Sequence, residues 1–143
     1  AARIRPAAME LLDPVALAAI LRYLGLPDDA PGTAHLLVQT DGGAAEEEAR
    51  AALAIITAHS GTASMTTDPD EGERMLAVRR AMHPAMESLA RVLIEDVAVP
   101  RSQLPAMFAA IRRIGERHGI DIPTVAHAGD GNLHANLVYE GEE

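Results

Sequence analysis

The dipeptide Asp130-Gly131, placed between two apolar runs, constrains the fold of this chain more than any other feature. An Asp-Gly pair between strand-like segments predicts a β-hairpin, because both central residues of a type I′ turn need positive φ. The two predicted strands cover residues 122–128 and 133–139. With the turn centred on Asp130-Gly131, we expect His127 to lie directly opposite His134.

The period of two along a strand gives this hairpin one polar face. His134 and Asn136 point to one side, together with His127, while Leu133 and Ala135 point to the other. Opposed Cβ atoms on one face are about 4.5–5.5 Å apart, so two imidazoles there can bind one metal ion. Two solvated histidines, or histidines bonded to carbonyl groups, remain the alternative, because one His pair supplies too few ligands for a three-ligand catalytic site. We expect the remaining histidines to be structural or solvated: His35, His59, His83 and His118.

Helical and strand patterns alternate along the rest of the chain. Asp13-Pro14 supplies an N-cap and a first-turn proline, and Gly25 ends the helix that follows. Pro84 is expected to interrupt the third helix. The predicted helices cover residues 13–24, 46–59, 68–83 and 102–118, and the further strands cover 34–39, 62–67 and 92–99. This order predicts an α+β fold, a ferredoxin-like sandwich with a mixed or antiparallel sheet covered by helices.

Composition excludes several classes of protein. The chain of 143 residues carries a formal net charge of −9, which disfavours binding to nucleic acid. It has no cysteine, and therefore neither disulfides nor a thiolate metal site. We find no membrane-spanning segment and no signal peptide, so we expect a single, cytoplasmic domain. Because the chain starts without Met and stops just after a strand-like run, we expect it to be a piece of a longer protein.

The segment from His127 to Asn136 resembles a known signature. Its sequence, HAGDGNLHAN, is similar to the HxGDGNxHxN motif of FAD-linked oxidases of the vanillyl-alcohol-oxidase type, in their C-terminal domain. Three further segments resemble that family in the same order: AMELLD at residues 8–13, LVQTDG at 37–42 and EDVAVP at 95–100. The resemblance covers residues 1–143 and implies a partial C-terminal domain, without the N-terminal FAD-binding domain and the final C-terminal segment.

The resemblance implies an enzyme that oxidises a D-2-hydroxy acid of the glycolate or D-lactate type by hydride transfer to FAD. His127 and His134 would bind a divalent metal, with zinc as the expected ion. Asn132 and Asn136 would contact the flavin, and Asn136 would also contact the substrate. The resemblance further implies that the FAD domain of the same parent chain is a partner.

The resemblance also implies an arginine that pairs with the substrate carboxylate. Arg79 is the match, and a guanidinium suits a bidentate carboxylate; Arg80, one residue away, is the alternative. The family's third metal ligand, a glutamate in a later GEHG segment, lies beyond this chain. Some relatives have a substrate-binding lysine where this chain has Leu93-Ile94, so a monocarboxylate substrate is favoured over a dicarboxylate.

Two other classes of function stay open at this point. One is a free-standing ferredoxin-like module that binds a metal or a small ligand without redox chemistry. The other is a scaffold that dimerises through a sheet edge, which requires His127 and His134 to be unpaired in space. Whether the chain forms a homo-oligomer is likewise open.

Overall fold

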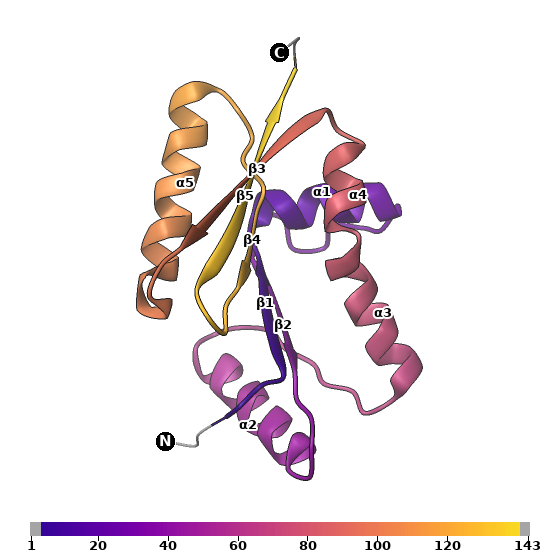
Figure 1. Cartoon of the computed structure of the whole chain (residues 1–143). Coiled ribbons are helices and arrows are strands. Elements are labelled where there is room, and N and C mark those ends of the chain that lie inside the picture. Colours follow the sequence, from indigo (N-terminus) through magenta and orange to yellow (C-terminus); the bar gives the residue numbers. More distant parts are fainter. Residues whose placement is uncertain (1–3, 141–143) are drawn as a thin grey trace.

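One antiparallel sheet forms the centre of the computed structural model, which describes residues 4–140 (Figure 1). Its five strands lie in the order β2-β1-β4-β5-β3. They are β1 (Ala8–Leu12), β2 (His35–Gln39), β3 (Arg91–Ala98), β4 (Thr124–His127) and β5 (Asn132–Tyr139). The predicted α+β fold is confirmed, and of the two predicted kinds of sheet the antiparallel one is observed.

The helices connect these strands. They are α1 (Pro14–Leu24), α2 (Ala45–Ala58), α3 (Pro69–Arg80), α4 (Met82–Glu87) and α5 (Leu104–His118), with a short 3₁₀ turn at Arg101–Gln103. The longest, α5, has 15 residues. Within residues 4–140 no helix has the length and apolar character needed to cross a membrane.

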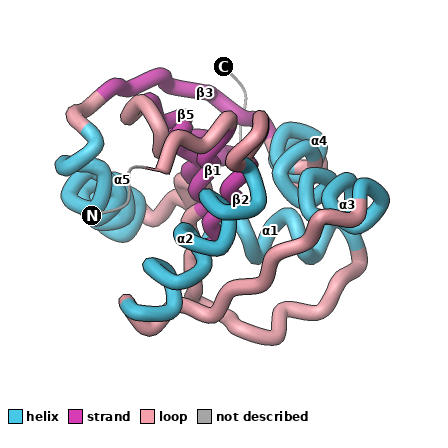
Figure 2. The backbone as a smooth tube through the Cα atoms, turned by 90° about the horizontal axis from the view of Figure 1, so that it is seen from below, coloured by secondary structure: helices cyan, strands magenta, loops and turns pink. Residues whose placement is uncertain are grey.

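Helices lie on both sides of the sheet, α5 on one side and α1, α3 and α4 on the other (Figures 1 and 2). The side of α5 is packed with apolar residues along the middle strands. They include Ala126, Leu133 and Ala135 from the sheet and Leu104 and Ile111 from α5. This face therefore forms one of two hydrophobic clusters.

The opposite face of the sheet is apolar at one end only. Leu12 and Val125 pack there against Ile20 of α1 and Met86 of α4, all at most 3 % exposed. Two polar residues lie further along the same face. Glu10 is two residues before Leu12 on β1, and His127 is two residues after Val125 on β4. The other end of this face is consequently polar, and it carries the candidate site.

Local sequence explains how α1 begins and ends. The Asp13 side chain accepts a hydrogen bond of 2.7 Å from the backbone N–H of Ala16, and Gly25 ends the helix with a φ of 66°. The Asp13 backbone N–H also donates to the carbonyl of Thr124 at 3.0 Å. Burial raises the pKa of the Asp13 carboxyl group, and its hydrogen bonds from Ala16 and the neighbouring backbone oppose that shift.

One prediction about secondary structure was wrong. Residues 62–67 form no strand; the segment is irregular, with only Ala63, Met65 and Thr66 half-buried, because its small polar side chains offer little apolar surface to a sheet. Pro84 does coincide with the expected interruption of the third helix, because α3 ends at Arg80, the residue four positions earlier whose carbonyl the proline ring would meet. Pro84 itself lies in the first turn of α4, where the missing N–H is not needed by the helix, and α4 continues to Glu87.

Candidate functional site

The turn between β4 and β5 differs from the predicted one. It spans residues 128–131, and the strands pair His127 with Asn132 and Val125 with His134. The prediction that His127 lies directly opposite His134 was therefore wrong. Among the described residues only Ser60 combines a side chain with positive φ, so Asp130 does not adopt the conformation that a type I′ turn requires.

Side-chain chemistry accounts for this turn. Asp130 Oδ1 accepts a hydrogen bond of 2.9 Å from the backbone N–H of Asn132, and Gly131 takes the positive φ of 95°. The register is shifted by two residues from the predicted one, and an even shift leaves every side chain on its predicted face. His127 and His134 consequently become diagonal neighbours on one face.

The two imidazoles meet through their Nε2 atoms. His127 Nε2 lies 3.2 Å from His134 Nε2, and the ring centroids are 5.1 Å apart with the ring planes nearly perpendicular. Both side chains remain partly accessible, with exposed fractions of 39 % and 26 %. The pair is therefore close and accessible from outside the protein.

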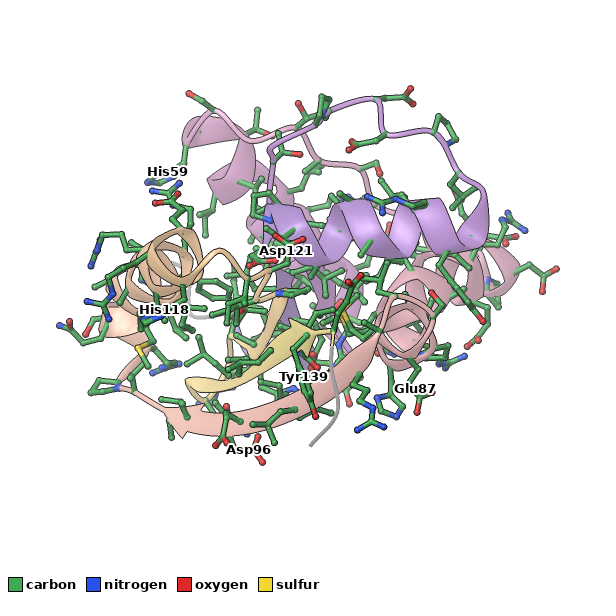
Figure 3. All side chains as sticks on the ribbon, turned by 90° about the horizontal axis from the view of Figure 1, so that it is seen from above. His59, Glu87, Asp96, His118, Asp121 and Tyr139 are labelled. Carbon is green, nitrogen blue, oxygen red and sulfur yellow. The ribbon has the colours of Figure 1, made fainter. Side chains whose placement is uncertain are left out.

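Each imidazole is also bound to a carboxylate through its other nitrogen. Glu10 Oε1 lies 2.6 Å from His127 Nδ1, and Asp96 Oδ1 forms an equally direct contact with His134 Nδ1. Glu10 comes from β1, and Asp96 projects from the edge strand β3 (Figure 3). Sequence reasoning missed both roles, although a single acidic residue within the apolar strand Ala8–Leu12 was a usable signal.

Arg79 joins this group from α3. Its Nε donates to Glu10 Oε2 at 2.8 Å, and its side chain is 25 % exposed. Arg80, the alternative, instead pairs with Glu73 on the surface, where both side chains are more than 60 % exposed. The structure thus links Arg79, and not Arg80, to His127 through Glu10.

The two predicted asparagines lie on the same face with different surroundings. Asn136 is 3 % exposed, and its Nδ2 donates to the carbonyls of Pro123 and His134, both at 3.0 Å. Asn132 is half-buried beside the turn, paired with His127 across the hairpin. Asn136 therefore ties β5 to the segment before β4. The flavin contacts of both residues and the substrate contact of Asn136 remain predictions.

The other histidines lie apart from the pair. His59 Nδ1 contacts the Ile55 carbonyl at 2.9 Å, and His83 forms an exposed pair with Glu87. His118 is exposed at the end of α5. Burial lowers the pKa of His35 at the start of β2. These placements match the structural or solvated role that we expected.

We call the five connected residues the histidine cluster: Glu10, Arg79, Asp96, His127 and His134. Two bonds of about 2.0–2.1 Å to a tetrahedral zinc ion place two nitrogens about 3.3 Å apart, close to the observed 3.2 Å. Carboxylates on the outer nitrogens are the usual second partners of metal-bound histidines. Within the described residues, however, no group of three or more His, Asp or Glu side chains converges on one point. The Nε2 atoms of His127 and His134 therefore fit two ligand positions of a metal site.

The antiparallel sheet with helices on both sides, together with the histidine pair on one face, defines an α+β domain with a candidate metal site. Residues 1–143 match the family described as FAD linked oxidases, C-terminal domain, and the chain belongs to that family.

The chain is similar to curated proteins named glycolate oxidase subunit GlcD and D-lactate dehydrogenase. The chain is 36 % identical over 140 residues to glycolate oxidase subunit GlcD of Bacillus subtilis, covering 94 % of this chain and 29 % of that protein. It is 35 % identical over 116 residues to D-lactate dehydrogenase of Archaeoglobus fulgidus, covering 78 % and 25 %. For GlcD of Escherichia coli K12 the identity is 28 % over 144 residues, covering 96 % and 28 %. The chain thus spans between a quarter and three tenths of the length of these relatives.

Proposed function

We propose that this chain is the substrate domain of an FAD-dependent enzyme that oxidises a small D-2-hydroxy acid to the 2-oxo acid. The family and the names of the relatives support an acid of the glycolate or D-lactate type. The observation that carries the proposal is the hydrogen-bonded row that links Arg79 through Glu10 to His127 and His134 at the polar end of one sheet face.

His127 and His134 would bind a divalent metal, with zinc as the expected ion, through their facing Nε2 atoms. When bound, the metal would supply a Lewis acid for the hydroxyl and carboxylate oxygens of the substrate, and FAD would supply the two-electron acceptor for the oxidation. Arg79 would bind the substrate carboxylate. Its Nε bonds to Glu10, and within residues 4–140 its two terminal amino groups form no further hydrogen bond to the protein.

The charges of the histidine cluster favour a monocarboxylate substrate. With neutral imidazoles, two carboxylates stand against one guanidinium, which leaves one excess negative charge. A divalent cation reverses this to one positive charge, and a carboxylate ligand from another part of the parent brings the sum to zero. A 2-hydroxy monocarboxylate then adds one negative charge and a dicarboxylate adds two, and the cost of the second charge grows as water is excluded.

The proposed site is completed by other parts of the parent protein. Catalytic metal sites commonly use three protein ligands, and this hairpin supplies two. We propose that a carboxylate from a segment following these residues is the third, and that an FAD-binding domain of the same parent chain faces the histidine cluster. Asn132 and Asn136 remain candidates for contacts with the flavin. Asn136 would act through the backbone of Pro123 and His134, to which its side chain bonds.

Titration of the chain with zinc tests the histidine pair. We expect weak binding that His127→Ala or His134→Ala largely abolishes, because each substitution removes one of two nitrogen ligands. His83→Ala and His118→Ala, at exposed positions outside the cluster, serve as controls and should leave the affinity unchanged. Isothermal calorimetry measures it. Affinity that does not depend on His127 and His134 would contradict the proposed site.

Arg79→Lys in the full-length parent tests the proposed carboxylate contact. Lysine keeps the charge but loses the planar pair of donors, so kcat/KM for glycolate or D-lactate should fall about 10–100-fold, mainly through KM. Arg80→Lys is the matched control, because Arg80 bonds to Glu73 on the surface. Equal effects of both substitutions would exclude a specific role for Arg79. Absence of flavin-dependent oxidation of any 2-hydroxy acid by the parent would instead favour the binding module without redox chemistry.

A further inference from the structure

We propose that Glu10 and Asp96 are positioning residues, which set the tautomer and ring orientation of His127 and His134 so that both Nε2 lone pairs point at one place. The inference rests on the proposed function, because it concerns the residues that would bind the metal. It assigns a role to Glu10 and Asp96, which lie outside the motif at residues 127–136 and are not themselves proposed as metal ligands.

Strand register places each carboxylate beside its own histidine. Glu10 on β1 is the direct cross-strand partner of His127 on β4, and Asp96 on β3 is the direct partner of His134 on β5. Directly paired side chains on one face have Cβ atoms about 4.5–5.5 Å apart, within reach of a hydrogen bond. The four residues thus form a row across four adjacent strands, with the carboxylates outside and the imidazoles between them.

Hydrogen-bond chemistry then fixes the tautomers. An ionised carboxylate can only accept hydrogen bonds, so the Nδ1 atom that faces it must carry a hydrogen. A neutral imidazole with its hydrogen on Nδ1 has its lone pair on Nε2. Because both rings are held in this way, two lone pairs face each other across 3.2 Å. Two facing lone pairs repel each other, and a cation between them removes the repulsion.

The two carboxylates differ in burial, and this predicts unequal effects. The Glu10 side chain is 15 % exposed and its second oxygen is held by Arg79, whereas the Asp96 side chain is 71 % exposed. Water competes more strongly for the exposed contact. Glu10 should therefore restrain His127 more strongly than Asp96 restrains His134.

Ring-nitrogen NMR of the metal-free chain tests the tautomers directly. The measurement uses protein whose histidine ring nitrogens carry the NMR label, at about pH 9, where an unperturbed imidazole is neutral. We expect the hydrogen on Nδ1 in both rings. Glu10→Gln should move hydrogen to Nε2 in His127 alone, because Arg79 and His127 bond to different oxygens of Glu10. The single oxygen of glutamine would stay with the charged Arg79, and its NH2 group, a donor, would face His127 Nδ1. Asp96→Ala should move hydrogen to Nε2 in His134. Hydrogen on Nε2 of either ring in the unsubstituted chain would overturn the proposal.

Zinc affinity provides the second measurement. Loss of such a partner costs 10–100-fold in metal affinity, and we expect this for Glu10→Gln, with a smaller loss for Asp96→Ala. Glu73→Gln, whose carboxylate pairs with Arg80, and Glu95→Ala, one residue from Asp96 on the other face, are the matched controls. Circular dichroism confirms that each variant is folded.

The two measurements separate the two proposals. A change in affinity without any movement of hydrogen between ring nitrogens would mean that the carboxylates act by charge alone, and positioning would be rejected. An unsubstituted chain that shows both Nδ1 hydrogens but binds no zinc, alone or within the parent, would reject the proposed metal pair and leave the positioning role established.

Discussion

Asp13 shows how a single residue both stabilises this fold and carries an electrostatic cost. Its carboxylate caps α1 through the N–H of Ala16, while burial raises its pKa. A carboxyl group whose pKa is higher in the folded state binds its proton more tightly there, so its contribution to stability falls as the pH rises through that raised pKa.

Substitution of Asp13 separates the two effects. Asp13→Asn keeps the capping oxygen without the buried charge, so its stability relative to the unsubstituted chain should increase from about pH 4 to neutral pH. Asp13→Ala loses the cap, which costs about 0.5–2 kcal/mol. Urea unfolding at several pH values measures both. An alanine variant as stable as the asparagine variant at neutral pH would show that the cap contributes nothing.

At the scale of the elements, the β4–β5 hairpin depends on Gly131. This residue has a φ of 95°, and a Cβ atom there would lie 2.0 Å from the carbonyl oxygen of Val99, which is backbone and cannot give way easily. Gly131 also accepts a hydrogen bond of 3.0 Å from the Val99 N–H, so the turn is tied to the segment after β3. The spacing of His127 and His134 therefore depends on the absence of a side chain here.

Gly131→Ala should destabilise the chain by about 1–3 kcal/mol or more and reduce zinc binding with it, because strain and a backbone clash add. Gly129→Ala in the same turn is the control. Gly129 has no positive φ, and an added Cβ meets no atom within 4 Å, so the change should stay within about 0.5 kcal/mol. Denaturant unfolding compares the two variants. Equal stability would contradict the role given to Gly131.

For the molecule as a whole, the proposed division of work between this chain and an FAD-binding domain predicts the behaviour of the chain in isolation. The Gly-rich segment at residues 129–131 is a turn between two strands and precedes no helix, so it offers no helix N-terminus to a pyrophosphate. A formal charge of −9 also disfavours a bound phosphate group. The proposed FAD contacts of Asn132 and Asn136 therefore need the rest of the parent to hold the cofactor.

We expect the purified 143-residue chain not to retain FAD on gel filtration, while the full-length parent retains it. Absorbance at flavin wavelengths in the protein peak measures this. A stoichiometric amount of flavin bound to the isolated chain would mean that this domain holds the cofactor by itself.

Local chemistry in the sequence determined the elements and the faces of this protein. Asp13, Pro14 and Gly25 set the limits of α1 because caps and backbone preferences act over a few residues. The period of two put His134 and Asn136 on one side of β5, and that assignment survived a wrong register because the shift was even.

Only the tertiary structure decided which partners meet at the site. The order of the strands carries Glu10 to His127, 117 residues further along the chain, and Asp96 to His134. The packing of α3 selects Arg79 over Arg80, although both are arginines on one helix. Such contacts join distant parts of the chain, and neither helical nor strand periodicity records which strands become neighbours.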